Sequence, residues 1–200
     1  MCSIILSYIN CSNEERTMKP VLKPLEPPYS AEVAKIFKRY PQNDDGYIIL
    51  LFRVFANSIR FLTNKGVLNL LDKDSPLALR EREIVILRVT ANLRCEYEWG
   101  VHVSTFAKAA KLTNEQIAAT RLAENDAECW TPRESLLVRC VDELCTHAKI
   151  QDDTYKQFQE CWDLEQQLEI LALCGNYHTV GFVANTSRIP PEDMGAKFPI

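Results

Sequence analysis

Residues 80–111 read REREIVILRVTANLRCEYEWGVHVSTFAKAAK, and they concentrate more reactive side chains than any other part of the chain. They include the carboxylate of Glu83, the thiol of Cys95, a second carboxylate at Glu98 and the imidazole of His102. These groups recur at intervals that helices can bring together on one side. The stretch therefore predicts a buried active site carried by helices.

Three of these groups fall on one stripe if a helix begins at Cys95. At about 100° per residue, Glu98 lies roughly 60° and His102 roughly 20° from Cys95 around the helix axis. Tyr97 and Trp99 flank this stripe. We predict that their rings line the substrate pocket and help to exclude water from it.

Helical periodicity extends over nearly the whole chain, and no segment shows the sustained alternation that is typical of strands. The sequence predicts an all-α fold with about seven to nine helices in one domain. A bend near residues 92–94 would fold Glu83 back against the stripe. Tyr177 and His178 on the last helix are interpreted as packing residues, with pocket lining as the alternative if that helix covers the site. The expected helices cover residues 31–39, 46–64, 77–93, 95–110, 131–147, 152–161 and 164–185, with shorter ones near residues 67–71 and after residue 113.

Helix start signals support several of these boundaries. Thr113 is a suitable N-cap, and Gln116 follows it at the spacing of a capping box. The run TPRE at residues 131–134 combines a cap residue, a proline at the first helical position and a glutamate close behind. Asp152 or Asp153 is expected to cap the helix that follows.

The chain divides into three parts by composition. Residues 1–29 form an extension whose end, residues 19–29, is a proline-rich strap, because proline lacks an amide donor and favours extended backbone. Residues 30–188 hold the helical domain. Residues 189–200 are broken by prolines and form an irregular tail. The first residues, 1–17, are expected to add nothing to the fold.

Composition and charge exclude several classes of protein. Of the 200 residues, 46% are hydrophobic and 25% are charged, as in ordinary globular domains. The net charge of −4 and the lack of a basic cluster argue against nucleic acid as a partner. Apolar runs are shorter than the ~20 residues that span a bilayer, so no membrane partner is expected. Eight cysteines without a CxxC pair indicate reduced thiols in a cytoplasmic protein.

The four reactive groups permit two kinds of chemistry. His102 could take the proton of the Cys95 thiol and stabilise the thiolate. Alternatively, Glu83, Glu98 and His102 could perform general acid–base catalysis without a thiol. A mixed set of cysteine, glutamate and histidine lacks the spacing of established zinc sites, so we expect no metal and no cofactor.

Three motifs lie in the segment LALREREIVILRVTANLRCEYEWGVHVSTFAKAAKLTNEQIAA, residues 77–119, and together they are fairly specific. They are RxRE at residues 80–83, YEWGxH at residues 97–102 and KLTNEQI at residues 111–117. Through these motifs, residues 76–122 resemble the carboxymuconolactone decarboxylase family, which includes the AhpD-like alkylhydroperoxidases. The resemblance implies a single AhpD-like helical domain.

In AhpD-like peroxidases, a glutamate, a CxxC pair and a histidine form a proton relay. The resemblance places Glu83 on that glutamate, Cys95 on the first cysteine and His102 on the histidine. Glu98 stands where the family has its second cysteine, the one taken to attack peroxide. Cys95 would then need an external reductant or another thiol of the fold. The candidates are Cys129, Cys140, Cys145 and Cys174.

The resemblance implies a peroxidase-type antioxidant enzyme that uses a Glu–Cys–His proton relay on a hydroperoxide. Two alternatives stay open. One is a cofactor-free acid–base enzyme of the decarboxylase or lactone type, in which Glu98 and His102 act on a small organic acid or lactone. The other is a non-catalytic oligomeric binding protein. Family members are usually homo-oligomers, so we expect a trimer or hexamer, with residues 47–62 and the proline-rich strap at its interface.

Overall fold

The structure is a computed structural model that describes residues 23–63, 75–122 and 127–200. Within these ranges it contains nine helices and no strands, which confirms the predicted all-α fold. None of these helices has the length and apolar character needed to cross a bilayer. In chain order the helices are α1 (Ala31–Phe37), α2 (Leu50–Phe55), α3 (Ile59–Thr63), α4 (Leu79–Asn92), α5 (Glu96–Phe106), α6 (Asn114–Leu122), α7 (Pro132–His147), α8 (Asp152–Cys161) and α9 (Leu164–Ser187).

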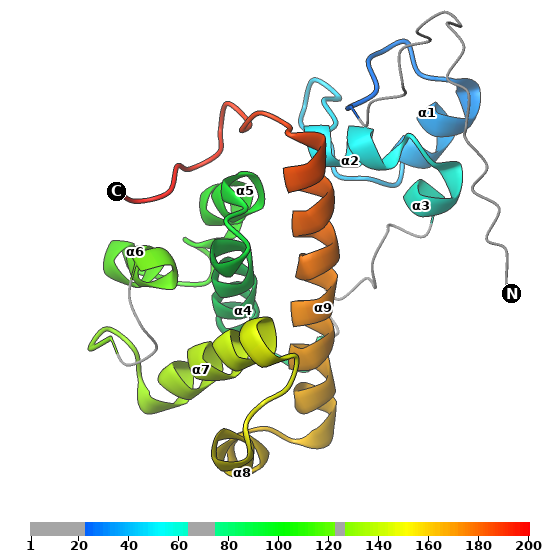
Figure 1. Cartoon of the computed structure of the whole chain (residues 1–200). Coiled ribbons are helices and arrows are strands. Elements are labelled where there is room, and N and C mark those ends of the chain that lie inside the picture. The colour runs from blue at the N-terminus through cyan, green and yellow to red at the C-terminus, as the bar shows by residue number, and fades with distance from the viewer. Residues whose placement is uncertain (1–22, 64–74, 123–126) are drawn as a thin grey trace, which may run out of the picture.

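Helix α4 lies at the centre of the fold and contacts α5, α6, α7 and α9 (Figure 1). Its residues 83–91 are all buried, and a helix covered on all sides needs apolar residues around most of its circumference. The polar exceptions are Glu83, Arg88 and Thr90. The guanidinium of Arg88 donates to both carboxylate oxygens of Asp142 on α7, at 2.6 and 2.8 Å. This bidentate pair compensates the buried charge, so α4 can be the core helix that carries the first site residue, Glu83.

Helix α9 is the longest element and connects the two ends of the molecule (Figure 1). Helices α7 and α8 contact it, and α2 contacts it as well. In Figure 1, α8 lies near its N-terminal end, whereas α1, α2 and α3 gather beside its C-terminal end. The region between α2, α5 and α9 is where the candidate site forms.

A tight turn separates α4 from α5. Arg94 has a φ of 53°, in the left-handed region, and ends the helical run. The amide of Cys95 then donates to the carbonyl of Thr90 at 2.8 Å. Cys95 is therefore the N-cap of α5 rather than a residue of its helical face. The predicted stripe of three groups is wrong in this respect, because it assumed that helical geometry already applied at Cys95.

The single helix predicted over residues 46–64 is also wrong. The chain forms α2 and α3 instead, with a break at residues 56–58. The side-chain amide of Asn57 donates to the carbonyls of Lys23 at 2.6 Å and Val54 at 2.9 Å. Asparagine side chains compete with helical backbone hydrogen bonds in this way, so the helix is interrupted although its apolar pattern continues.

The start signals of α6 and α7 are confirmed. Thr113 Oγ1 accepts from the amide of Gln116 at 3.2 Å, and the Gln116 side chain accepts from the amide of Thr113 at 3.1 Å. Thr131 and Glu134 form the same reciprocal arrangement at the start of α7. The aspartate cap predicted for α8 is wrong, because the N-cap position is Gln151 and no side chain caps it.

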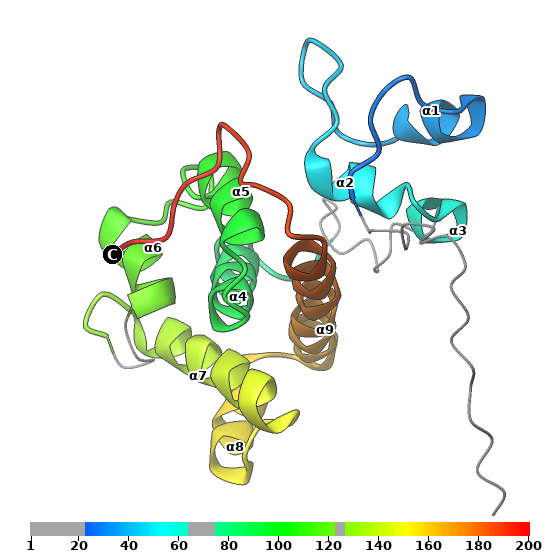
Figure 2. The same cartoon turned by 45° about the horizontal axis from the view of Figure 1, so that its top comes forward.

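The tail after α9 has no regular secondary structure and crosses over α5 (Figure 2). The amide of Ala196 donates to the carbonyl of Gly100 at 3.1 Å. A β-carbon at Gly100 would clash with the carbonyl oxygen of Ala196, so this contact requires glycine. The ring of Phe198 packs on Trp99 with a centroid distance of 5.2 Å. The tail is thereby held against α5.

The described end of the proline-rich strap lies against α2. The amide of Leu25 donates to the carbonyl of Arg53 at 3.1 Å, and the Arg53 Nε donates back to the carbonyl of Leu25 at 2.7 Å. The predictions for residues 1–17, for the first part of the strap and for a short helix at residues 67–71 lie outside the described residues.

Candidate active site

The site begins with a buried ion pair between the two central helices. Nδ1 of His102 on α5 lies 2.9 Å from Oε2 of Glu83 on α4. Both side chains are almost fully buried. The turn between α4 and α5 brings them together across nineteen positions of sequence, as the bend near residues 92–94 predicted. A carboxylate in this position fixes the orientation of the imidazole and its protonated nitrogen.

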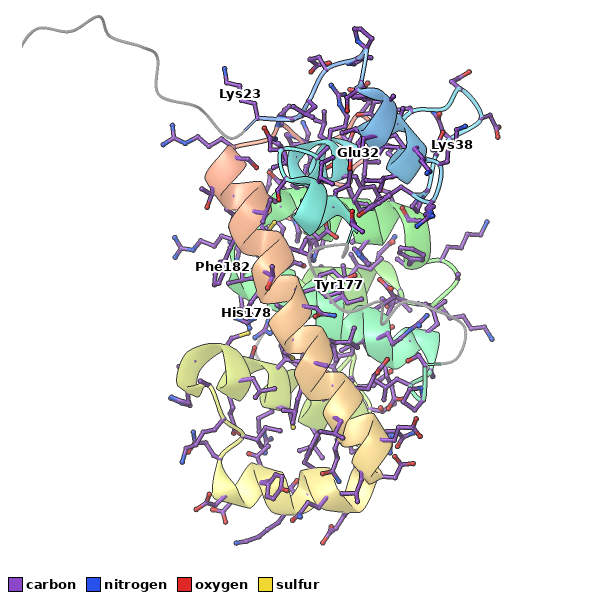
Figure 3. All side chains as sticks on the ribbon, turned by 90° about the vertical axis from the view of Figure 1, so that its right-hand side faces the viewer. Lys23, Glu32, Lys38, Tyr177, His178 and Phe182 are labelled. Atoms are coloured by element: carbon purple, nitrogen blue, oxygen red, sulfur yellow. The ribbon has the colours of Figure 1, made fainter. Side chains whose placement is uncertain are left out.

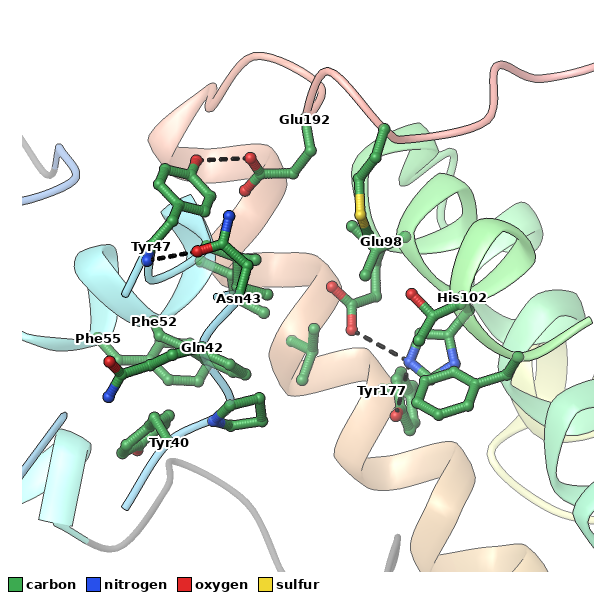
Figure 4. A pocket seen from close by; sticks show the side chains of 18 of the residues that line it. Tyr40, Gln42, Asn43, Tyr47, Phe52, Phe55, Glu98, His102, Tyr177 and Glu192 are labelled. Carbon is green, nitrogen blue, oxygen red and sulfur yellow. Dashed lines mark hydrogen bonds and ion pairs between the residues drawn. The ribbon is translucent and has the colours of Figure 1, made fainter. Parts of the chain in front are cut away.

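The other ring nitrogen of His102 faces two further groups. Nε2 lies 3.4 Å from Oε1 of Glu98, one helical turn earlier on α5, and 3.0 Å from the hydroxyl of Tyr177 on α9. Figure 4 shows Glu98 and Tyr177 converging on the imidazole. Oε2 of Glu98 is buried and has no hydrogen-bond partner. A buried carboxylate oxygen without a partner is costly, and in a cavity wall it marks a position for a ligand.

The protonation of His102 follows from these neighbours. Burial by itself lowers the pKa of the imidazole, but the charge of Glu83 and the hydrogen bonds that Glu83 and Glu98 accept from the ring outweigh burial and raise the pKa of His102 to about 9. Burial, followed by the charges of Glu98 and Glu83, raises the pKa of Tyr177 well above its ordinary value. At neutral pH the site therefore holds an imidazolium and a protonated tyrosine.

A cavity of about 1070 Å³ opens onto this cluster. Glu98, His102 and Tyr177 line it from α5 and α9, and Figure 4 shows them facing a set of aromatic side chains from the opposite side. That opposite wall comes from the loop over residues 39–47 and from α2, and the tail closes a third side. Helix α9 thus covers the site, which makes Tyr177 a lining residue and not only a packing residue.

The structure places Cys95 apart from this cavity. The thiol is fully buried and does not belong to the cavity wall. Its Cβ lies in van der Waals range of the position that a β-carbon on Gly181 of α9 would take. Burial raises the pKa of the Cys95 thiol to about 11. The candidate partner thiols, Cys129, Cys140, Cys145 and Cys174, do not line the cavity either.

The structure also places Tyr97 and Trp99 away from the cavity wall. The hydroxyl of Tyr97 donates to Oε1 of Glu192 at 2.5 Å and accepts from the amide of Leu51 at 3.1 Å. The indole N–H of Trp99 donates to Oγ1 of Thr120 at 2.9 Å. Both rings hold α5 to its neighbours, so they support the site without contacting a ligand in this cavity.

Glu192 is a site residue that the sequence did not reveal. Besides Tyr97, its carboxylate accepts from the hydroxyl of Tyr47 at 2.6 Å and from the amide of Leu50 at 2.7 Å (Figure 4). These donors come from α5, from the loop before α2 and from the start of α2. Glu192 thus fastens the tail over the cavity, and nothing in the irregular sequence around it signals this role.

Among the described residues, no three His, Cys, Asp or Glu side chains form a group suited to hold a metal ion. The polar groups that meet at this end of the cavity are the carboxylate of Glu98, the imidazole of His102 and the phenol of Tyr177.

The comparison with known families fits this geometry. No curated protein matches the chain significantly. The model of the carboxymuconolactone decarboxylase family matches residues 63–143. The matched segment includes Glu83, Cys95, Glu98 and His102, whereas Tyr177 and Glu192 lie beyond it. Over residues 63–143, which are 81 of its 200 residues, the chain is similar to the carboxymuconolactone decarboxylase family.

Proposed function

We propose that the protein is a cofactor-free acid–base enzyme that moves a proton at a carbon atom next to a carbonyl group. The observation that carries this proposal is the unpartnered Oε2 of Glu98, buried in the cavity wall beside an imidazole held from both sides. A general base must lie within reach of the proton that it takes, and Glu98 is the carboxylate of the cluster that lines the cavity.

In the proposed step, Glu98 removes the proton from the carbon atom. The electron pair of the broken C–H bond forms a C=C bond to the carbonyl carbon, and the π pair of the C=O bond moves to the oxygen, which gives an enolate. His102 is an imidazolium whose Nε2–H points toward Glu98 and Tyr177. The imidazolium donates to the Tyr177 oxygen, so the hydroxyl proton of Tyr177 points away from His102. This proton can then form a hydrogen bond to the negative charge that develops on the carbonyl oxygen of the substrate. Return of the proton from Glu98 to the same or a neighbouring carbon completes the turnover.

The remaining cluster member, Glu83, does not line the cavity. It acts on the reaction only through His102, whose orientation and charge it sets at 2.9 Å. Glu83 is therefore a positioning residue in this proposal, whereas Glu98, His102 and Tyr177 are the catalytic residues.

The peroxidase prediction, with a Glu–Cys–His relay, stays a prediction. A thiolate is the reactive form of cysteine, and burial disfavours it at Cys95. One experiment with wild type and Cys95→Ala distinguishes the acid–base function from the peroxidase function. We measure hydroperoxide consumption with a thiol reductant, and proton exchange of a ring ketone in deuterated water by NMR. The proposal expects exchange in both proteins. Peroxide consumption that Cys95→Ala abolishes, without any exchange activity in wild type, would overturn it.

A non-catalytic binding protein is the other rival. It would be stabilised by the same ketone in a thermal unfolding assay, yet wild type would exchange no faster than buffer. The expected homo-oligomer and the cytoplasmic setting with reduced thiols are part of the proposal as well, and light scattering and thiol titration of freshly purified protein test them.

A further inference from the structure

We infer that the cavity takes an uncharged carbonyl compound with a ring body, and that it discriminates against carboxylic acids. The carbonyl group of the ligand rests on the proposed function. The selectivity of the cavity against carboxylic acids follows from the residues of the cavity wall alone. It departs from the small organic acid that the family resemblance suggested.

The charges of the cavity wall are mostly negative. The carboxylates that line it are Asp45, Glu98, Glu192 and Asp193. Among the described lining residues, Arg39 is the only lysine or arginine. It is exposed, as are Asp45 and Asp193, whereas Glu98 and Glu192 are buried. An anionic ligand at the end of the cavity formed by Glu98, His102 and Tyr177 would lie beside Glu98, where like charges repel more strongly than at the surface because Glu98 is buried.

The positive charge of His102 does not offset this repulsion. The imidazolium lies between Glu83 at 2.9 Å and Glu98 at 3.4 Å. The imidazole is therefore already shared between two acidic side chains of this chain. A ligand carboxylate would therefore meet negative charge beside Glu98. It would also lose its hydration on entering the cavity, which costs further free energy.

The opposite wall is suited to a ring. It presents the aromatic side chains of Tyr40, Phe52 and Phe55 (Figure 4). On the side of His102, Phe106 at the end of α5 adds a fourth ring, 5.1 Å from the imidazole between ring centroids. The hydroxyl of Tyr40 is already bonded to the carbonyl of Leu62 at 2.6 Å, so its ring is the part left for a ligand. Cavities of 300–1,000 Å³ hold drug-sized ligands, and the 1070 Å³ here accommodates fused rings.

A matched pair of probes tests the inference with the full chain. The neutral probe is β-tetralone carrying a methyl ester, and the charged probe is the same ketone carrying the free carboxylate. Dissociation constants are measured by calorimetry at neutral pH, and exchange of the acidic benzylic proton is followed by NMR in deuterated water. We expect the ester to bind at least about tenfold more tightly than the carboxylate, because one repulsive contact of this kind is worth about a factor of ten.

Two variants locate the source of the selectivity. Asp45→Asn removes one charge from the cavity wall and should narrow the difference between the probes. Asp153→Asn is the control, because Asp153 is exposed on α8 and pairs with Lys156 at 2.9 Å, outside the cavity wall. Equal or tighter binding of the carboxylate, or no binding of either probe, overturns the inference. Selective binding of the ester without exchange supports it and overturns the proposed acid–base function instead.

A different observation concerns the outer face of α9. Four large apolar side chains are exposed there: Leu164, Leu168, Leu171 and Phe182. With Gly175 and His178 they follow steps of four, three, four, three and four residues. Figure 3 shows Phe182 and His178 on the other side of α9 from Tyr177, which faces the cavity. Alternating steps of three and four are typical of helices that pack along a second helix.

We infer that a second copy of this chain covers this face through an antiparallel contact between two α9 helices. A two-fold axis brings the same stripe of both copies together. Antiparallel packing centred near Gly175 would place Arg188 at the C-terminal end beside Asp163 and Glu165 of the second copy, whereas parallel packing would bring like charges together. Nothing lies within 4 Å of a β-carbon built on Gly175, so the two backbones can approach closely there.

Light scattering coupled to size exclusion tests this contact. Wild type should contain an even number of copies at micromolar concentration, and Leu168→Glu should halve that number. Leu122→Glu is the matched control, because Leu122 is also exposed but lies on α6. A wild-type monomer or trimer, as when residues 1–22 of the same chain cover the face, would overturn the inference. An assembly that Leu168→Glu leaves intact would do so too.

Discussion

Replacement of Glu83 by glutamine tests how the site holds its charge. The structure pairs Glu83 with His102 at 2.9 Å in a buried setting, where the pKa of the imidazole rises from its usual 6.5 to about 9. At about 1.4 kcal/mol for each pKa unit, this rise corresponds to about 3 kcal/mol of stability. Glutamine keeps the shape and a hydrogen bond but not the charge. We expect the pKa of His102 to fall by about two units or more in Glu83→Gln.

The same pair makes stability depend on pH in a defined window. Because the pKa of His102 is higher in the folded chain than in the unfolded chain, the ion pair contributes fully below pH 6.5 and its contribution is lost as the pH rises through about 9. Glu83→Gln should therefore lower the free energy of unfolding by about 3 kcal/mol near pH 6, and by much less near pH 10.

Histidine-labelled protein followed by NMR over this range gives the pKa directly, and urea denaturation gives the stability. Glu81→Gln is the control on the same helix, because Glu81 pairs with Arg133 and Trp162 rather than with His102. An imidazole in Glu83→Gln that still titrates near 9 would refute the reasoning. So would a stability difference that is the same at both pH values.

Three further changes probe the elements that hold the site. Glu192→Gln weakens the acceptor of three hydrogen bonds and should lower the free energy of unfolding by about 2 kcal/mol in urea denaturation. The control Asp193→Asn should change it little, because the neighbouring Asp193 is exposed. Gly100→Ala would clash with the carbonyl of Ala196, so the tail should become sensitive to limited proteolysis while the rest of the chain stays protected. Thr131→Ala removes half of a capping box and should lower the free energy of unfolding by about 1 kcal/mol.

Local signals in the sequence were sufficient for much of the fold. The start of α7 follows from its cap residue, its proline and its glutamate, because the cap and the glutamate accept hydrogen bonds from backbone amides only a few residues away. The proximity of Glu83 and His102 was also predicted, because helical periodicity and the turn between α4 and α5 bring them together. The break between α2 and α3 was not predicted. It depends on Asn57 reaching the distant backbone of Lys23, which periodicity does not report.

The remaining site residues depend on tertiary structure. Tyr177 reaches His102 only because α9 packs along α4 and α5. Glu192 stands in an irregular tail, and its three donors come from two distant parts of the chain. Cys95 was placed on the helical stripe because its spacing to Glu98 is helical, yet the left-handed turn at Arg94 makes it a cap residue instead. Spacing alone does not reveal where a helix begins.

Proton exchange by the Glu98→Gln variant tests most directly the central claim that Glu98 is the general base. Wild type and variant are compared on the neutral tetralone ester in deuterated water, with Asp153→Asn as the control and circular dichroism to confirm folding. Glutamine can still bond to His102, so the variant loses the base and not the fold. We expect exchange in wild type and in Asp153→Asn to exceed that of Glu98→Gln by about 100-fold or more, the usual contribution of a general base. Exchange at the wild-type rate in Glu98→Gln would contradict the role of Glu98.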